Sequence, residues 1–176
     1  RNLFTAVCMH NTLRDLQTKA EYTQSPLERA DAVVTVSHAI ARIFRKKGIP
    51  EKVCTIYNPH DLTHVRRMAE ERVRHPWFAE RDLPVAVGMG RLCRQKNFPL
   101  LLEAVSRLNR DAGIPVRLVL FGDGPHRDRL LRKIRREGLQ DRVRLMGWVA
   151  NPFRYLARAD LFVLSSEWEG LPNTLI

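Results

Sequence analysis

The sequence predicts an α/β fold, a Rossmann-like parallel sheet with helices on both faces, preceded by the tail end of a second Rossmann-like domain. Short apolar runs alternate along the chain with segments of helical periodicity, a pattern typical of parallel sheets covered by helices. The runs are rich in apolar and β-branched residues, as expected for strands buried on both faces. A charged connection between two such series indicates two domains.

The first series ends at the turn signal Asn58-Pro59. Residues 12–22 are polar and fit a helix or a loop. Gly48 is expected to end the helix His38–Lys47. The expected strands are Leu3–Met9, Ala32–Ser37 and Val53–Tyr57, and the expected helices are Pro26–Ala30 and His38–Lys47.

The second series follows His60–Asp82, a charged segment that we expect to be a helix followed by a connection. Its expected strands are Val85–Met89, Val116–Phe121, Val143–Met146 and a buried Leu161–Leu164; its expected helices are Phe98–Arg110, His126–Glu137 and Pro152–Arg158. The predicted division is therefore 1–59 for the end of an N-terminal domain, 60–83 for the interdomain connection, and 84–176 for an incomplete C-terminal domain.

The composition of the chain limits the classes of protein to which it can belong. The 176 residues are 44% hydrophobic, as in an ordinary globular protein, and include no long apolar run and no signal-peptide pattern. The three cysteines are distant and odd in number, which favours a reducing cytoplasm over a disulfide framework. Because the chain begins at Arg1 and ends inside an expected helix, we interpret it as a fragment.

The net charge of +11 is concentrated in two segments, 42–47 and 127–136. In the second, Leu130, Leu131 and Ile134 form the apolar stripe of an amphipathic helix that is otherwise basic. This helix face is either simply solvated or attracted to anionic lipid. Nucleic acid is not an expected partner, because no aromatic residues interleave the basic run and no nucleic-acid-binding motif is present.

The last ten residues, Glu167–Ile176, follow the final expected strand. Gly170 permits a sharp turn, and Pro172 suits the first position of a helix. The N–H groups of residues 173–175 are then expected to point outward and bind an anion, while Glu169 can accept hydrogen bonds from hydroxyl groups. The pattern fits a sugar attached to a diphosphate, although an ordinary strand–turn–helix corner explains it as well.

The loop after the first strand of the second series, residues 88–99, matches neither GxGxxG nor a Walker A loop. It offers Arg91 and Lys96 on either side of a helix start, where both can bind phosphate. Two surface cations are the alternative. Since the carboxyl ends of parallel strands share one edge, this loop and the Glu169 segment are expected at the same edge of the sheet.

Three further patterns carry weaker signals. Residues 122–126 are expected to form a simple turn. Gly147 would let the backbone approach a flat nucleobase, with Trp148 either beside it or packed in the core. His60 and His64 have the spacing of a helical zinc pair, but Asp61 replaces the usual glutamate and no third ligand is evident, so no metal site is predicted.

Taken together, these motifs resemble the GT-B-fold retaining glycosyltransferases of family 4 over nearly the whole chain. The segment 169–176 matches the first eight positions of that family's Glu-x7-Glu signature, and His10 looks like its donor-facing histidine. The other matching segments are 30–37, 56–59, 90–101, 121–125, 143–147 and 159–166.

The resemblance implies a retaining hexosyltransferase that moves a sugar from a nucleoside-diphosphate donor, UDP preferred to GDP, to an acceptor hydroxyl, without a metal or other cofactor. It implies a saccharide or lipid-linked acceptor, a role in cell-surface polysaccharide, lipopolysaccharide or glycolipid synthesis, and a cytoplasmic site, peripheral to the inner face of the plasma membrane. The fragment alone is expected to be inactive. The alternatives are a non-catalytic nucleotide- or polyanion-binding module and a basic peripheral membrane protein. The implied catalytic residues are Arg91, Lys96, Glu169 and His10, and the implied donor-binding residues are Gly90, Gly147, Trp148, Gly170, Leu171, Pro172, Asn173, Thr174 and Leu175.

Overall fold

The structure, a computed structural model, describes residues 5–9, 29–46 and 52–175. These residues form two compact units: one takes in the residues up to His60 and those from Trp168 onward, and the other runs from Asp61 to Glu167. Three predicted features lie outside the described residues, namely His10, the segment 12–22 and all but the last two residues of the helix expected at 26–30. The predicted domain boundaries at 59 and 83 stay predictions.

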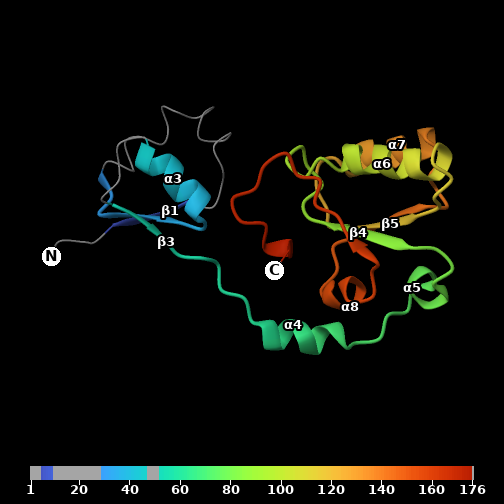
Figure 1. Cartoon of the computed structure of the whole chain (residues 1–176), viewed down its shortest axis with the longest axis horizontal. Helices are drawn as coiled ribbons and strands as arrows, with labels where there is room; N and C mark the ends of the chain where they lie inside the picture. The colour runs from blue at the N-terminus through green and yellow to red at the C-terminus, as the bar shows by residue number, and fades with distance from the viewer. Residues whose placement is uncertain (1–4, 10–28, 47–51, 176) are drawn as a thin grey trace. The chain divides into compact units, whose positions relative to one another are not determined.

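The described part of the first unit contains a parallel sheet with the strand order β1 (Ala6–Met9), β2 (Ala32–Thr35), β3 (Val53–Thr55). Helix α3 (His38–Lys46) follows β2 (Figure 1). The Ser37 hydroxyl accepts a hydrogen bond from the Ile40 N–H (3.4 Å), as a helix N-cap does. The apolar face of α3 packs on the sheet in a core of Val33, Val36, Ile40, Ala41, Phe44 and Val53.

The residues described in the second unit form a four-stranded parallel sheet in the order β6-β5-β4-β7. The strands are β4 (Val85–Met89), β5 (Arg117–Phe121), β6 (Val143–Gly147) and β7 (Leu161–Phe162). The helices are α4 (Leu62–Ala69), α5 (Pro76–Glu80), α6 (Phe98–Arg110), α7 (Arg127–Arg136) and α8 (Phe153–Leu156).

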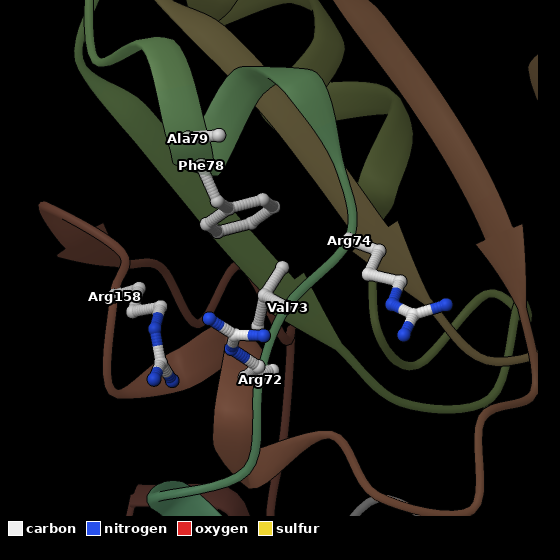
Figure 2. A pocket seen from close by; sticks show the side chains of 6 residues that line it. All are labelled: Arg72, Val73, Arg74, Phe78, Ala79 and Arg158. Atoms are coloured by element: carbon white, nitrogen blue, oxygen red, sulfur yellow. The ribbon is translucent and has the colours of Figure 1, made fainter.

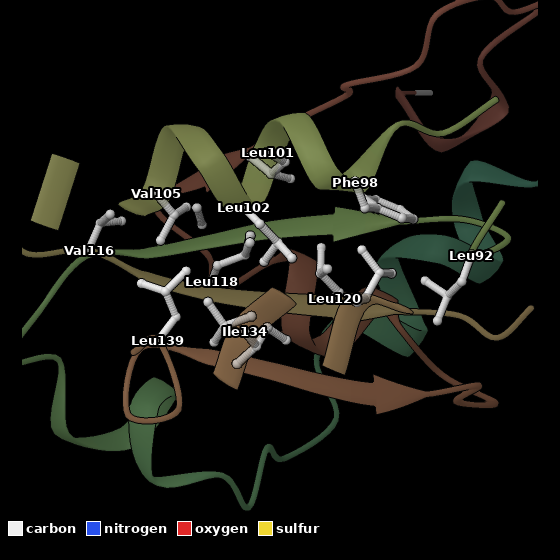
Figure 3. Close-up of a cluster of buried hydrophobic side chains, with 13 residues drawn as sticks. Leu92, Phe98, Leu101, Leu102, Val105, Val116, Leu118, Leu120, Ile134 and Leu139 are labelled. Carbon is white, nitrogen blue, oxygen red and sulfur yellow. The ribbon is translucent and has the colours of Figure 1, made fainter. Parts of the chain in front are cut away.

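Both faces of this second sheet are covered. Leu118 and Leu120 of β5 join the core beneath α6 and α7 (Figure 3), whereas Val119 and Phe121 pack on the opposite face, with Trp77 and Phe78 of α5 and Tyr155 of α8. Figure 1 shows α6 and α7 on one side of the sheet and α5 and α8 on the other. The side chains of β5 alternate with the period of two that a strand requires, and the predicted fold class is confirmed.

Three element predictions are wrong in detail. The strand at Leu161 is not fully buried, because β7 is the edge of the sheet and leaves the Leu161 side chain 58% exposed. The connection before Val85 contains α5, which begins at Pro76 and buries Trp77 and Phe78. The helix expected from Pro172 is a 3₁₀ turn over Asn173–Leu175.

Candidate functional site

The loops after β4, β5 and β6 are hydrogen-bonded to one another at the carboxyl ends of the strands. The Gly90 N–H donates to the Phe121 carbonyl (2.9 Å), and the Gly122 N–H donates to the Gly147 carbonyl (2.7 Å). The Leu92 N–H donates to the Asp123 carbonyl (2.9 Å). These bonds continue the ladder of the sheet, and we call the three loops (residues 90–97, 122–126 and 147–149) the carboxyl-end layer.

Two glycines make this close backbone approach feasible. Gly122 has φ +126°, and a Cβ atom there would lie 2.0 Å from the Gly90 carbonyl oxygen. Gly124 has φ +155°, and its Cβ would lie 2.7 Å from the Leu92 carbonyl oxygen. The sequence predicted only a turn here. The signal that was missed is the Gly-Asp-Gly spacing, which brings two bare backbone positions against the preceding loop.

The predicted cations Arg91 and Lys96 both belong to this layer. A Cβ on Gly90 would lie 2.6 Å from Cε of Lys96, so the lysine stem runs along the Gly90 backbone. The Arg91 side chain is exposed, and Lys96 is half-buried. The structure therefore brings Gly90, Arg91 and Lys96 to one edge of the second sheet, as expected; their chemical roles stay predictions.

Gly147 and Trp148 follow β6 at the same edge. Gly147 has φ +71°, and nothing lies within 4 Å of the position where its Cβ would stand. Trp148 is 77% exposed. The alternative in which Trp148 packs in the core is therefore wrong, and the indole is accessible to a ligand.

The segment after β7 braces the loop that carries the cations. The Ser165 hydroxyl donates to the Lys96 carbonyl (2.7 Å), and the Glu167 N–H donates to the Gln95 carbonyl (2.8 Å). Arg94 Nε and Glu167 Oε2 are 3.9 Å apart. This role of the segment was not predicted, because a serine just after a strand is too common in sequences to indicate it.

The predicted donor-binding residues at the C-terminal turn belong to the first unit. Leu171 packs against the core beneath α3, and the Asn58 side-chain amide donates to Asn173 Oδ1 (3.0 Å). Glu169, Gly170, Pro172 and Thr174 are half-buried.

Two of the three N–H groups that were expected to point outward at this turn are engaged within the turn itself. The Asn173 N–H donates to the Leu171 carbonyl (2.9 Å) and the Leu175 N–H to the Pro172 carbonyl (2.8 Å). The bond from Leu175 has the i→i−3 spacing of a 3₁₀ turn, and the bond from Asn173 spans only two residues.

The His60–His64 pair does not form a zinc site in the described residues. Asp61 caps α4 by accepting the His64 N–H (2.9 Å), and His64 Nδ1 lies 3.2 Å from an Arg67 guanidinium nitrogen. Across the described ranges, no group of three or more His, Cys, Asp and Glu side chains could hold a metal ion.

The basic helix α7 is amphipathic as predicted. Leu130 and Ile134 are buried beneath it, and Arg129, Arg132, Arg135 and Arg136 are exposed. Attraction of this face to anionic lipid stays a prediction. A helix with the length and apolarity needed to cross a bilayer is not found among the residues that the structure describes.

The fold is that of the GT-B glycosyltransferases, α/β domains with parallel sheets. Over 99% of this chain, the structure matches 34% of a mutant of S. aureus TarM, whose crystals contain Fondaparinux, alpha-GlcNAc-glycerol and UDP, with a TM-score of 0.75 and 17% identity. At this identity the likeness establishes the fold alone.

The family follows from the sequence itself. Residues 83–176 match the family model of the group 1 glycosyl transferases, and residues 6–64 match that of Glycosyltransferase Family 4. The chain belongs to the group 1 glycosyltransferases.

Two curated relatives are similar to this chain in sequence. The N-acetylgalactosamine-N,N'-diacetylbacillosaminyl-diphospho-undecaprenol 4-alpha-N-acetylgalactosaminyltransferase of Campylobacter jejuni is 35% identical over 72% of this chain and 32% of its own length. The lipopolysaccharide core biosynthesis glycosyltransferase LpsE of Rhizobium meliloti is 32% identical over 93% of this chain and 44% of its own length. The chain thus spans less than half the length of these relatives.

Proposed function

We propose that the full-length protein transfers a sugar from a nucleoside diphosphate to a hydroxyl group of a saccharide or lipid-linked saccharide, with retention of configuration and without a required metal. The observation that carries the proposal is the carboxyl-end layer of a group 1 glycosyltransferase chain, in which Arg91 and Lys96 flank the bare Gly90 backbone. Open α/β sheets bind ligands at this edge.

Each residue receives one role. Arg91 and Lys96 stabilise the negative charge that develops on the leaving diphosphate, an electrostatic effect strongest where the groups are held in place beforehand. The bonds from the Ser165 hydroxyl and the Glu167 N–H to this loop provide that support. Glu169 accepts hydrogen bonds from hydroxyls of the donor sugar, and His10 contacts the same sugar.

The reaction has a simple balance. The bond between the anomeric carbon and the diphosphate oxygen breaks, and the acceptor oxygen forms a bond to that carbon on the same face. The acceptor proton passes to the departing diphosphate, so no protein side chain is assigned as a general base. The nucleobase lies by Gly147 and the exposed Trp148, where the backbone is open.

The relatives support the class of donor and acceptor. TarM was crystallised with UDP, and the Campylobacter enzyme is named for a diphospho-undecaprenol-linked acceptor. We therefore propose a UDP-sugar as the preferred donor, ahead of a GDP-sugar, and a cytoplasmic enzyme that builds a cell-surface polysaccharide, lipopolysaccharide or glycolipid.

The test is a thermal-shift titration of the full-length protein with UDP, GDP and ADP. A ligand at one hundred times its Kd stabilises a protein by about 2.7 kcal/mol, which raises the melting temperature of a domain of this size by a few degrees. We expect UDP to produce this shift and the Arg91→Ala, Lys96→Ala double variant to abolish it. The double variant Arg129→Ala, Arg132→Ala, which removes two exposed cations from α7, should keep it.

Turnover of a UDP-sugar is the second readout. Arg91→Ala should lower it by about tenfold or more, because a single preorganised donor to a developing oxyanion contributes at least that much. A variant with normal turnover excludes Arg91 from the reaction. Nucleotide binding without any detectable transfer favours the non-catalytic module instead.

A further inference from the structure

The second unit contains a second group of cations, around α8 and the extended segment before α5. Two adjoining hollows, of about 400 and 570 Å³, share Arg72 and Arg74 in their walls. Arg158 completes the first hollow and Arg154 the second. We call these four side chains and the space between them the arginine pocket. Figure 2 shows the Arg72 guanidinium below the Phe78 ring with the Arg158 side chain to its left, while Arg74 extends away to the right.

The arginine pocket is separate from the carboxyl-end layer. Arg158 lies two residues before Asp160, whose carboxylate accepts the N–H of Val85 (2.8 Å), the first residue of β4. That end of the sheet is the amino end. No residue of the three carboxyl-end loops lines either hollow, so the proposed donor chemistry does not use the pocket.

Two of the guanidinium groups are held in position by the backbone and by neighbouring side chains. Arg158 donates to the carbonyls of Ala69 (3.0 Å) and Arg154 (2.8 Å). Arg154 lies over the Tyr155 ring, 5.0 Å from its centroid, and its guanidinium is 3.7 Å from Glu71 Oε2. Its Nε is buried and has no hydrogen-bond partner in the described part of the chain. A buried donor in this state lowers the stability of the folded protein.

The charges of the pocket are not balanced. Glu71 is the one carboxylate among its lining residues, against four arginines. Among the residues that the structure describes, the side chains of Arg72 and Arg74 form no hydrogen bond or ion pair. Three arginines line each hollow and repel one another, and an anion bound beside them relieves that repulsion.

We propose that the arginine pocket binds phosphate groups. Arginines that line one surface hollow suit a phosphate, because a guanidinium can donate two hydrogen bonds to phosphate oxygens and a phosphate carries more than one negative charge. Val73, Phe78 and Tyr155 give the pocket an apolar floor that suits the remainder of a phosphate-bearing molecule. The source of the phosphate is either a soluble ligand or a lipid headgroup, since both present the same chemistry.

Isothermal titration with inorganic pyrophosphate tests the pocket. The full-length protein should carry Arg91→Ala and Lys96→Ala throughout, so that binding at the carboxyl-end layer does not contribute. This background should still bind pyrophosphate. Adding Arg72→Gln and Arg74→Gln should weaken binding by about tenfold or more, because two of the positive charges that line the pocket are lost.

The matched control adds Arg129→Gln and Arg132→Gln to the same background. It removes the same net charge from exposed positions on α7 in the same unit, and pyrophosphate affinity should stay within about a factor of two. Equal losses in both variants would mean diffuse attraction to a basic protein and would overturn the proposal. Absence of binding in the starting background would overturn it too. Because Arg72 and Arg74 make no described side-chain bonds, their variants should keep the parent melting temperature. If they do not, Arg72→Lys with Arg74→Lys is compared with Arg129→Lys and Arg132→Lys, which tests whether the pocket needs the guanidinium groups at unchanged net charge.

Vesicles identify the source of the phosphate once pyrophosphate binding depends on the pocket. Phosphatidylcholine vesicles with and without phosphatidic acid are sedimented with the same variants. Binding that requires phosphatidic acid, falls in the Arg72 and Arg74 variant and is displaced by pyrophosphate assigns the pocket to a lipid headgroup. If the Arg72 and Arg74 substitutions leave vesicle binding unchanged, the ligand of the pocket is a soluble phosphate.

Discussion

The carboxyl-end layer and the arginine pocket are two cation-bearing regions of one unit, and they are built in opposite ways. In the layer, glycines with positive φ let three loops approach until their backbones hydrogen-bond, and Arg91 and Lys96 are carried on that frame. In the pocket, the backbone before α5 has no regular structure, and arginine side chains line the hollows together with apolar residues.

The difference indicates which kind of substitution should disturb each region most. A change in the layer moves a backbone that several loops share, so its effect spreads through the unit. A change in the pocket removes a charge from a surface hollow and leaves the frame intact. The layer should therefore respond to added volume, and the pocket should respond to lost charge.

The largest effect is expected from Gly122→Ala. The new Cβ would lie 2.0 Å from the Gly90 carbonyl oxygen, at a backbone conformation of φ +126°. Neither atom belongs to a flexible side chain, so the two loops must separate and the Gly122–Gly147 bond is strained. We expect the free energy of unfolding to fall by about 3 kcal/mol or more, as measured by urea denaturation.

Gly138→Ala is the matched control for this substitution. Gly138 also has positive φ, +66°, but nothing lies within 4 Å of its Cβ position. It should cost only the conformational strain, about 1 kcal/mol. If the two substitutions lower the free energy of unfolding equally, conformational strain at the glycine, and not the close approach of the loops, accounts for the loss.

A smaller and more local effect is expected from Trp148→Ala. Trp148 is 77% exposed, so the free energy of unfolding should change by less than about 0.5 kcal/mol. If a nucleobase stacks on the indole, affinity for UDP should fall by about tenfold, since stacking contributes about 1–3 kcal/mol per base. Trp148→Phe keeps an aromatic face and should retain most of the affinity; unchanged affinity in the alanine variant removes Trp148 from the donor site.

Much of the second unit was predictable from the sequence, because its strands have strong local signals. Val85–Met89 and Phe98–Arg110 have the predicted bounds, since an uninterrupted apolar run and a long helical period leave few alternatives. The placement of Arg91 and Lys96 at the sheet edge followed from strand direction alone. That inference needed topology and no knowledge of side-chain contacts.

Other features depended on contacts that local patterns do not contain. The turn at Asn173–Leu175 has the residues of a helix start, and the sequence could not show that Leu171 packs on the first unit's core. The arginine pocket brings Arg72 and Arg74 together with Arg154 and Arg158, which lie far along the chain. In sequence these residues looked like part of a generally basic protein.

The smallest predicted effect concerns His75, which follows Arg74 and caps α5 by accepting the Trp77 N–H (3.3 Å). Burial is the main cause that lowers the pKa of His75 from its ordinary 6.5, and the charges of Arg144 and Arg117 lower the pKa further. Asp82 pairs with Arg117 (3.1 Å) and offsets part of its charge.

The sign of the pH dependence follows from that lowered pKa. Above pH 6.5 His75 is neutral in both the folded and the unfolded protein and does not affect stability. As the pH falls below 6.5, the unfolded chain binds a proton that the folded protein does not yet accept, so the free energy of unfolding decreases until the folded pKa is passed. Urea denaturation at about pH 7.5 and about pH 5.5, on either side of that value, measures the decrease.

His75→Asn keeps a capping side chain but cannot titrate, so its loss of stability over this pH interval should be smaller than that of the parent. Arg144→Gln should also reduce the loss, because it removes one of the charges that disfavour protonation. Arg144 and Arg117 lie on the Trp77 ring, 5.0 and 5.1 Å from its centroid, so the Arg144 variant separates the effect of charge from that of burial. If Arg144→Gln leaves the pH dependence unchanged while His75→Asn abolishes it, the charge of Arg144 does not contribute and burial with Arg117 lowers the pKa of His75.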